Sequence, residues 1–445
     1  MKVLLLNPYI TDFTAYDLWL RPLGLYYIAA VIRDYSDCEI YWLDALDRFQ
    51  TPLEFPSARD GRGKFHREIL EKPEIYKTVP RHYARYGIPI EQFREKMEAL
   101  PGIDVILVTT LMTYWIDGVK LCLNLLRGRF PKAKVVIGGI LANLAPREVR
   151  KIVGIDAVVQ GRGEEQILPL LGQLGARILP HPDFSNINAI PLPAFDFAGT
   201  REYLPLLTSR GCPFRCDYCA SPILNSGFAE RSPEAIAAEI SQMAETYGTR
   251  HFIIFDDAFL VNKAKRLFQI FRSLDCRLGV RFHTPNGLHA REIDGETAET
   301  LHAARFETIR LSFESLSPRI LARSSGKVTR KEMENALARL EKAGYARKEM
   351  EAYLLFGYPG QAVQDMEEAL LFVADQGIVP RLSFYSPVPG TKDYSRLRKK
   401  GILSSPPDLY ETNKIYSLYE KSGFSLSEIE RIRKRTTEIT RQNRG

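Results

Sequence analysis

The sequence predicts an α/β chain with two parallel sheets: a doubly wound, Rossmann-like domain followed by a partial (β/α)6 barrel. Short apolar runs alternate with helical patterns along most of the 445 residues. Continuous apolar runs separated by helices are typical of parallel sheets that are covered on both faces. The alternation is interrupted at residues 176–200, where Pro and Asn are frequent and no period is sustained. We therefore expect two domains joined by a linker at 176–200.

The first domain is expected to span residues 1–175. Ligands of such open sheets lie at the carboxyl ends of the strands, and here the expected strands end in small or polar residues. The expected strands are 2–8, 39–46, 104–111, 134–139 and 156–161, and the expected helices are 22–35, 118–128, 146–153 and 164–174. A further segment, at about 48–100, is polar, charged and too long for a connecting loop. We interpret it as a helical insertion.

The second domain is expected at residues 201–395, where six strand–helix units follow one another. The expected strands are 203–209, 251–255, 279–284, 308–313, 351–357 and 380–387, and the expected helices are 233–247, 264–274, 296–304, 330–343 and 365–376. Units of this length predict a partial barrel whose chemistry lies at the carboxyl ends of its strands. Residues 396–445 have helical patterns and are expected to form a small helical C-terminal region.

Composition restricts the class of protein. No apolar stretch approaches the roughly 20 residues needed to span a bilayer. The apolar start is too short for a signal peptide, so we expect a cytoplasmic protein without a transmembrane segment. The net charge of +7 is mild for this length. Basic residues gather at 59–85 and 431–444, but they are mixed with Glu in helical patterns, so solvated faces are the simpler interpretation and a nucleic-acid partner is not expected.

The six cysteines are distributed unevenly. Three stand alone in apolar or helical contexts and are interpreted as buried small residues, namely Cys38, Cys122 and Cys276. The others, Cys212, Cys216 and Cys219, lie within eight residues directly after the first barrel strand. Structural zinc sites close with a fourth Cys or His at short spacing, and none follows here. A cubane cluster with one open iron explains the trio better than zinc, or than a redox cluster with a distant fourth ligand.

The segment CPFRCDYC, residues 212–219, resembles the C-x3-C-x2-C signature of the radical SAM superfamily, including the aromatic residue before the last cysteine. The resemblance implies that the three cysteines are catalytic ligands of a [4Fe–4S] cluster. The open iron would bind the amino and carboxylate groups of S-adenosylmethionine (SAM), and an electron from the cluster would release a 5′-deoxyadenosyl radical. The SAM contacts that the resemblance implies are Phe214, Tyr218, Asp256, Asp257, Ser312, Glu314 and Gly357.

Several of these implied contacts have a structural alternative. Asp256 and Asp257 follow the second strand, in FDDAF, and could instead cap a turn or a helix. Gly357, in LFGYPGQ, resembles the turn where the backbone approaches adenine, but it and Gly360 could serve the turn alone. The motif SPVPGT after the last strand resembles the same subgroup and has no assigned role.

The fourth barrel strand offers two further implied contacts, Ser312 and Glu314, which share one face if the strand alternates regularly. This strand resembles the one that contacts the ribose or methionine of SAM. The alternative for Glu314 is an ion pair with Arg310 or Arg323.

The first domain resembles the cobalamin-binding domain of cobalamin-dependent, class B radical SAM enzymes. The matching segments are RPLGLYYIAA, VTTLM, VVIGGILANLAP and VVQGRGEEQ. Their small, hydroxyl and glycine residues would let the sheet edge accept the nucleotide tail of the corrinoid. The implied cobalamin contacts are Pro8, Gly24, Thr109, Thr110, Met112, Gly138, Gly139, Gln160, Gly161, Gly163 and Glu164.

One motif of cobalamin proteins is missing from this sequence. In D-x-H-x-x-G the histidine binds cobalt from below, but here Asp12 is followed by Phe13 and Thr14. A cobalt without a protein ligand would face the TTLMTYW loop near Met112 or Tyr114, which could equally be packing residues. A degenerate domain without cobalamin is the alternative.

Together the two resemblances imply a cobalamin-dependent radical SAM enzyme, most simply a methylase that acts on an unactivated carbon. The alternatives are another radical reaction, such as cyclisation, rearrangement, sulfur insertion or carbon–carbon coupling, with or without cobalamin, and a non-enzymatic cluster protein. The expected partners are a small-molecule substrate, whose identity no residue indicates, and an electron donor such as flavodoxin or ferredoxin.

Overall fold

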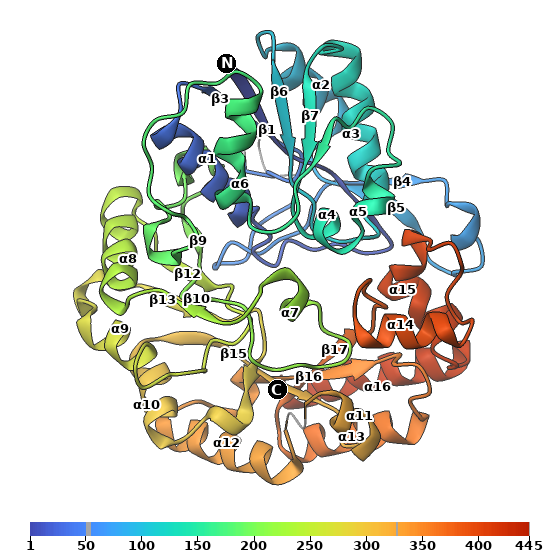
Figure 1. The fold of residues 1–445 in the computed structure, drawn as a ribbon. Coiled ribbons are helices and arrows are strands. Elements are labelled where there is room, and N and C mark those ends of the chain that lie inside the picture. The colour runs from blue at the N-terminus through green and yellow to red at the C-terminus, as the bar shows by residue number, and fades with distance from the viewer. Residues whose placement is uncertain (50–54, 326–327, 445) are drawn as a thin grey trace. The chain divides into compact units, whose positions relative to one another are not determined.

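The computed structural model describes residues 1–49, 55–325 and 328–444 and divides the chain into two compact units (Figure 1). The first unit comprises residues 1–202, 223–225 and 407–413, and the second comprises 203–222, 226–406 and 414–445. Both units are α/β, as the sequence predicts. Within the described residues, no helix combines the length and the apolar character needed to cross a membrane.

The first unit is built on five parallel strands in the order β3-β1-β6-β7-β8. Their bounds are β1 Lys2–Asn7, β3 Glu39–Asp44, β6 Val105–Val108, β7 Lys134–Ile137 and β8 Ala157–Val158. The order reverses at β1, which pairs with β3 on one side and β6 on the other. In open α/β sheets such a switch point leaves a crevice at the carboxyl ends of the strands.

Helices cover both faces of this sheet. They are α1 Leu23–Tyr35, α2 Ile90–Glu98, α3 Ile116–Arg129, α4 Ile140–Leu144, α5 Pro146–Val149 and α6 Gly163–Gln173. On β1, Val3 and Leu5 lie in the core cluster that contains α1 and α6. Leu4 and Leu6 lie in the opposite cluster, with α2 and α3. Because alternate residues of a strand point to opposite faces, a strand buried on both sides must be apolar throughout.

The predicted helical insertion at 48–100 is wrong in its secondary structure. Its described part contributes two strands, β4 (Arg67–Leu70) and β5 (Tyr83–Tyr86), and they form an antiparallel sheet with β2 (Ile10–Asp12) in the order β2-β5-β4. The 3-10 turn η1 (Glu74–Tyr76) and α2 are its helical parts, and residues 50–54 lie outside the described residues. No apolar run marks β4, which has the sequence REIL and an exposed face, so the pattern alone misses it.

Two segments expected elsewhere pack on the first unit. Residues 176–200, predicted as a linker, form two 3-10 turns, η2 (Ile187–Ala189) and η3 (Phe195–Phe197), and bury Phe184 and Ala194 in the core with α1. Residues 407–413, predicted as part of the helical C-terminal region, also belong to the first unit. We call residues 407–413 the strap.

The second unit contains six parallel strands in the order β17-β16-β15-β13-β12-β9, which confirms the predicted partial barrel. Their bounds are β9 Tyr203–Leu206, β12 His251–Ile254, β13 Arg281–His283, β15 Phe306–Glu314, β16 Met350–Phe356 and β17 Val379–Phe384. A short strand, β14 (Leu288–His289), pairs with β15, and β10 (Ser209–Arg210) pairs with β11 (Ala229–Glu230).

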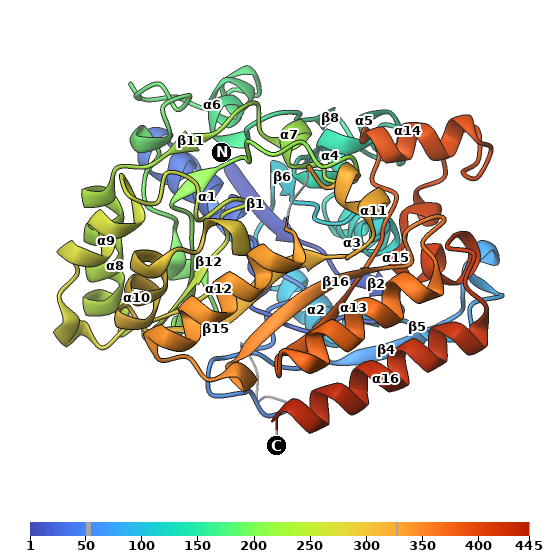
Figure 2. The ribbon, with the colours of Figure 1, turned by 90° about the horizontal axis from the view of Figure 1, so that it is seen from below.

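The helices between these strands follow the expected order. They are α7 Ser221–Leu224, α8 Pro233–Tyr247, α9 Leu267–Ser273, α10 Gly295–Ala303, α11 Pro318–Arg323, α12 Arg330–Ala343, α13 Val363–Asp375, α14 Lys392–Lys399, α15 Lys414–Tyr416 and α16 Leu426–Arg444. Helices α13 and α16 pack on the edge strand β17 (Figure 2). Ser232 caps α8, and Thr329 with Glu332 forms a capping box on α12, so both helices begin where the sequence predicts.

Candidate cofactor sites

A buried carboxylate anchors the chain between β9 and the cysteines. Asp256, which follows β12, accepts hydrogen bonds from the Thr208 amide (2.8 Å), the Thr208 hydroxyl (2.6 Å) and the Ser209 hydroxyl (2.5 Å). Arg266 pairs with the same carboxylate at 3.0 Å, and the Asp256 side chain has no exposed surface. Asp256 therefore supports the scaffold of the loop, and its contact with SAM stays a prediction.

The cysteine loop, residues 211–219, rests against the chain that follows α11. The loop starts at Gly211, whose φ of 84° lies in the left-handed region that glycine favours. The amide of Asp217 donates to the Arg323 carbonyl at 2.8 Å, and the Cys216 thiol donates to the Ser324 carbonyl at 3.3 Å. These bonds fix the middle of the loop.

The three thiols share one locality. Cys216 is buried, whereas Cys212 and Cys219 are half-buried. Burial, and then the neighbouring Cys219, Asp257 and Cys216, raise the pKa of the Cys212 thiol to about 11. The Ser221 amide donates to the Cys219 sulfur at 3.4 Å, which is the kind of contact that a thiolate ligand accepts.

The spacing of the sulfurs discriminates between the metals that three cysteines could hold. A tetrahedral zinc site places its thiolates about 2.3 Å from one ion, so their sulfurs lie within about 4 Å of one another. Among the described residues, the three cysteines do not form a group whose ligand atoms all lie within 4.8 Å of one another. A single zinc ion requires such a close approach of the sulfurs, whereas a multi-iron cluster, whose irons separate the thiolates, does not.

An aromatic stack stands beside the cysteines. The Phe214 ring lies 4.2 Å from the His289 ring at an interplanar angle of 20°, and the Arg291 guanidinium lies 5.8 Å from the Phe214 centroid. Tyr218 packs against the apolar cluster of α11 and β16, and burial followed by the charge of Glu314 raises its pKa. Phe214 and Tyr218, the two aromatic residues predicted as SAM contacts, thus pack around the cysteines.

Asp257 differs from its neighbour Asp256. Its side chain is exposed, and its carboxylate accepts a hydrogen bond from the Ser221 hydroxyl at 2.5 Å. The surrounding protein raises its pKa, an effect that the hydrogen bond from Ser221 opposes and the charge of Asp256 reinforces. The charge of Asp257 also raises the pKa of the Cys212 thiol, so this carboxylate lies near the cysteines.

The predicted pair on β15 does not follow regular alternation. Ser312 pairs with Tyr353 and Glu314 with Leu354, so the register shifts between them, and Glu314 has a φ of 67°. Both side chains are buried, at 5% and 8% exposure. The alternatives offered by the sequence have other partners, since Arg310 pairs with Glu351 at 2.8 Å and Arg323 donates to Tyr358 at 2.9 Å.

The glycine-rich turn after β16 is closed by its own side chains. The amides of Gly357 and Tyr358 both donate to the Gln361 side-chain oxygen, at 3.0 and 3.2 Å. Gly357 has a φ of 82°, and a Cβ there would lie 2.8 Å from Leu418. Gly357 therefore serves the turn and close packing with Leu418, and its contact with SAM stays a prediction.

A network of charges connects the cysteine loop to α14. Arg396 bonds both Asp217, at 2.9 Å, and Asp393. The Tyr358 hydroxyl donates to Asp393 at 2.6 Å and accepts from Arg323 at 2.9 Å. Thr391 in the SPVPGT motif caps α14 through the Tyr394 amide, so the motif, unassigned from sequence, starts the helix that holds this network.

The first unit has a separate cavity at the carboxyl edge of its sheet. Its volume is about 150 Å³, and its walls come from α1, the ends of β6, β7 and β8, and α6. The predicted cobalamin contacts that line it are Gly24, Thr109, Gly138, Gly139, Gly161, Gly163 and Glu164. The other walls are apolar, from Leu25, Ile28, Leu107, Val108, Val136, Val159 and Ile167.

Glycines keep this cavity open. A Cβ on Gly24 would meet no atom within 4 Å, and one on Gly138 would meet only Val159, at 4.0 Å, so a longer side chain at either position would enter the space. Gly139 has a φ of 87°, and its Cβ would lie 2.5 Å from the Thr110 carbonyl. The residues thus fit a flat, largely apolar ligand such as the nucleotide tail of a corrinoid.

Four predicted cobalamin contacts lie outside this cavity. Pro8, Thr110 and Met112 line a smaller depression at the same sheet edge with Trp115. Met112 is 42% exposed and Tyr114 only 3%, so Tyr114 is a packing residue. Gln160 is exposed and accepts a hydrogen bond from Arg150 at 3.4 Å.

The positions of the missing cobalt-binding motif are used for packing. Asp12 is fully buried and accepts hydrogen bonds from the Trp115 indole at 3.2 Å and the Asn413 amide at 3.0 Å. The Phe13 ring lies 5.0 Å from that of Tyr76. These side chains stabilise the unit and offer no imidazole to cobalt.

Sequence reasoning missed several residues that support these sites. His289, Arg266 and Arg396 reach the loop or its anchors from distant parts of the chain, and Ser221 lies two residues after the loop; no local motif marks any of them. The apolar walls of the cavity have the same pattern as any buried strand or helix, so periodicity alone cannot identify them.

Two family profiles match the chain. The profile described as radical SAM superfamily covers residues 206–373, and the profile described as B12 binding domain covers residues 81–170. The first segment contains the cysteine loop, and the second contains most of the cavity walls.

Individual proteins agree with these matches. An uncharacterised methyltransferase of Pyrococcus horikoshii is 24% identical over 83% of this chain and 77% of its own length. The cytidylyl-2-hydroxyethylphosphonate methyltransferase of Streptomyces wedmorensis is 24% identical over 92% of this chain and 84% of its own. The structure of the radical SAM methyltransferase TsrM from Kitasatospora setae, with cobalamin and a [4Fe–4S] cluster bound, superposes with a TM-score of 0.63 at 16% identity, over 91% of this chain and 79% of that one.

Proposed function

We propose that this chain, a radical SAM enzyme with a B12-binding domain, is a methyltransferase that adds a methyl group to an unactivated carbon of a small-molecule substrate. One observation carries the proposal. A three-cysteine loop at the carboxyl end of β9 and a glycine-lined cavity at the carboxyl edge of a doubly wound sheet occur in one chain, each at the segment of the matching family. The two curated methyltransferases that match most of the chain support the reaction type.

When bound, the cluster and SAM supply a 5′-deoxyadenosyl radical, and cobalamin supplies the methyl group. Cys212, Cys216 and Cys219 would hold three irons of the cluster. Asp257 would accept hydrogen bonds from the SAM amino group, since it is the exposed carboxylate beside Cys212. The Phe214–His289 stack would shield one side of the loop from water.

The cavity of the first unit would hold the nucleotide tail of cobalamin. Its apolar walls suit an aromatic base, and Thr109 and Glu164 supply polar groups for the sugar and phosphate or amide parts of the tail. Reduction of the cluster requires an electron donor, and we propose a flavodoxin or a ferredoxin because such clusters have low reduction potentials.

Anaerobic reconstitution with iron, sulfide and hydroxocobalamin tests the cofactors. The absorption spectrum is expected to contain both a corrinoid and an iron–sulfur component, and dithionite with SAM is expected to give 5′-deoxyadenosine. Cys216→Ala should abolish 5′-deoxyadenosine while retaining cobalamin. Persistent 5′-deoxyadenosine in that variant would contradict the cluster assignment.

A matched pair of glycine substitutions tests the cavity. Gly138→Leu places a side chain in the cavity and should lower cobalamin retention at least tenfold, with the cluster unaffected. Gly102→Leu is the control, because a Cβ at Gly102 meets no atom within 4 Å, whereas one at Gly138 meets only Val159 at 4.0 Å, and Gly102 does not line the cavity. Equal cobalamin retention in the two variants would place the cofactor elsewhere.

Product analysis tests the methyl transfer. With a substrate in hand, the product should be heavier by one methylene unit, and two SAM molecules should be consumed per turnover. A product of unchanged composition, as cyclisation or rearrangement would give, would overturn methylation while leaving the radical chemistry intact.

A further inference from the structure

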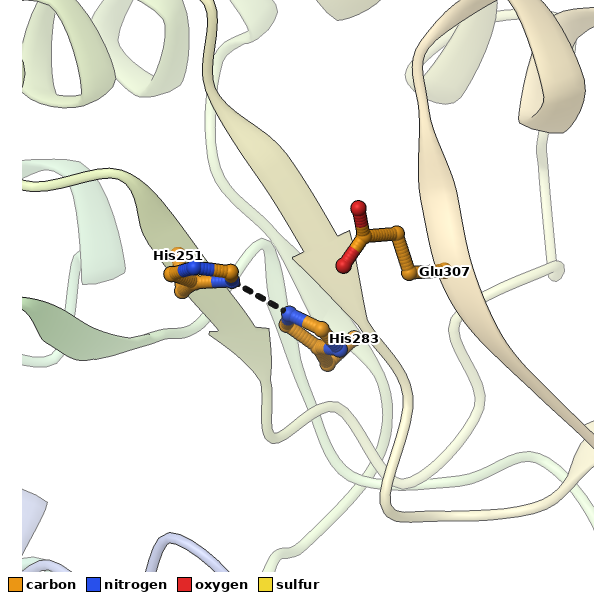
Figure 3. A group of neighbouring side chains, drawn as sticks. All are labelled: His251, His283 and Glu307. Atoms are coloured by element: carbon orange, nitrogen blue, oxygen red, sulfur yellow. Dashed lines mark hydrogen bonds between the residues drawn. The ribbon is translucent and has the colours of Figure 1, made fainter. Parts of the chain in front are cut away.

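Two buried histidines face each other from neighbouring strands of the barrel (Figure 3). His251 is the first residue of β12 and His283 the last of β13, and they are 8% and 1% exposed. Nδ1 of His251 lies 2.8 Å from Nε2 of His283. His251 is level with Tyr203, the first residue of β9, and His283 is level with Ile253 and Pro205, so the pair lies within the sheet, before the strand end that leads into the cysteine loop.

Strand alternation places both histidines on the inner face of the barrel sheet. Phe252 and Phe282, their neighbours in sequence, stack on one another, and Phe271 of α9 packs on Phe282 at 4.9 Å. The phenylalanines therefore occupy the face that the helices cover. The histidines point the other way, into the interior, where buried polar groups are normally hydrogen-bonded.

A carboxylate completes the group. One ligand atom each of His251, His283 and Glu307 lies within 4.8 Å of the others. Glu307 is on β15, the strand next to β13, and its carboxylate points toward His283 (Figure 3). One of its oxygens pairs with the Arg281 guanidinium at 2.7 Å, and both of these side chains are 45% exposed.

The second ring nitrogen of His283 is also fixed. Nδ1 of His283 lies 2.8 Å from the Thr308 hydroxyl, which leaves Nε2 as the nitrogen presented to His251 and Glu307. Histidines that bind metals almost always engage their other ring nitrogen in this way, because the contact sets the tautomer and the orientation of the ring. The short contact between the two rings aims two nitrogens at one small region.

We propose that His251, His283 and Glu307 form a binding site for a first-row divalent cation, with Zn²⁺ as its preferred ion. Two imidazoles and one carboxylate are a known zinc ligand set that leaves a fourth position for water. The same set disfavours Mg²⁺ and Ca²⁺, which prefer oxygen ligands. The ion would take the place of the proton between the two rings and tie β12, β13 and β15 together. The site is independent of the cluster and of the proposed methyl transfer.

Zinc titration of the full chain tests the proposal. The chain should carry Cys212→Ala, Cys216→Ala and Cys219→Ala, so that the cysteines cannot bind zinc, and thermal unfolding should first confirm its fold. Isothermal titration with Zn²⁺ is expected to show one equivalent bound, and Co²⁺ in place of Zn²⁺ should give visible absorption bands. Bound Zn²⁺ should also raise the unfolding temperature, since it binds the folded state.

Matched variants assign the binding to these residues. Glu307→Gln is expected to weaken Zn²⁺ binding at least tenfold, and His283→Gln to abolish it. Arg281→Met breaks the same ion pair with Glu307 without removing a ligand, and should bind Zn²⁺ like the parent. His302→Gln removes a histidine that packs elsewhere, against Tyr345, and is also expected to bind normally.

Absence of a bound equivalent in the parent would overturn the proposal, as would equal binding by the parent and Glu307→Gln. Glu307 is exposed, so Glu307→Gln is expected to fold. It therefore tests the site even if substitution of the buried His283 prevents folding. Loss of 5′-deoxyadenosine formation plays no part in the result.

Discussion

Asp256 and Asp257 are adjacent in the sequence, yet one is buried beside Arg266 and the other is exposed beside the cysteines. The sequence predicts a carboxylate at this strand end but cannot say which of the two meets a ligand. The difference in burial depends on Arg266, which lies ten residues after Asp256 and belongs to no recognisable motif.

Substitution of the two aspartates separates these roles. Asp256→Asn leaves the Arg266 guanidinium without its buried counter-charge, so it should lower the free energy of unfolding by about 3–5 kcal/mol. Asp257→Asn should leave stability nearly unchanged and raise the KM for SAM roughly tenfold or more, since a hydrogen bond to a charged group is lost. Chemical denaturation and 5′-deoxyadenosine assays measure the two effects. The reverse pattern would exchange the roles of the two residues.

A buried acid in the first unit predicts a pH-dependent stability. Burial, and then the charge of Asp47, raise the pKa of Asp44 to about 7, although the Leu46 amide, Arg21 and Asn7 oppose the shift. In the unfolded chain the pKa is about 3.9. The folded state therefore keeps a proton that the unfolded state loses, so the free energy of unfolding should fall by a few kcal/mol as the pH rises from about 4 to about 7.

Asp44→Asn should remove this part of the pH dependence, because the amide has no proton to lose and its oxygen can still accept from Asn7 and Leu46. Asp34→Asn, at a 40% exposed position, is the control and should keep the parental slope. Urea denaturation at several pH values measures both. An unchanged slope in Asp44→Asn would assign the dependence to another group.

At the scale of elements, α14 acts on the cysteine loop through Arg396. Burial alone would raise the pKa of Asp217, but hydrogen bonds from Arg396 and Lys392 hold it below its usual value. Arg396→Gln should loosen the loop by about 1 kcal/mol and shorten the lifetime of the cluster under a chelator roughly fivefold. Lys392→Gln is the control, because Lys392 is 69% exposed and lies 3.3 Å from the same carboxylate. Decay of the visible absorbance of the cluster measures both variants. Equal decay rates would show that Arg396 does not stabilise the cysteine loop.

Some elements could be predicted nearly to the residue and others could not. Helices α8 and α12 have local signals, Ser232 before Pro233 and Thr329 before Glu332, so their first turns are encoded in neighbouring residues. Strands β4 and β5 have no such signal, because β5 pairs with β2 across more than 70 positions of the chain and β4 joins the sheet only through β5. The glycines of the cavity could be found because only they leave space beside a packed strand end, whereas its apolar walls have no distinctive pattern.

At the scale of the whole molecule, the strap makes the first unit depend on a distant part of the chain. Leu409 is 6% exposed in the core with α2 and α3, Thr412 lies 2.7 Å from Thr113, and Tyr76 donates to the Tyr410 carbonyl at 2.9 Å. The three-stranded sheet and the strap therefore share one packed region of the first unit.

Leu409→Ala should create a cavity in this core and lower the free energy of unfolding of the first unit by about 2–5 kcal/mol. Leu426→Ala, at a 54% exposed position, is the control and should change it little. Denaturation followed by hydrogen exchange of β1 and β6 measures the effect. Equal exchange in the two variants would show that the strap does not support the sheet.

The strap has a consequence for the order of events at the ribosome. Residues 203–406, 204 in number, are translated between Glu202 and the strap, which at roughly 5–20 residues per second takes about 10–40 s. During that interval every strand of the Rossmann-like sheet has been translated, but Leu409, which packs in its core, has not. The barrel strands are still being translated. Chaperone capture should therefore peak on nascent chains of this intermediate length and decline once residue 413 leaves the exit tunnel.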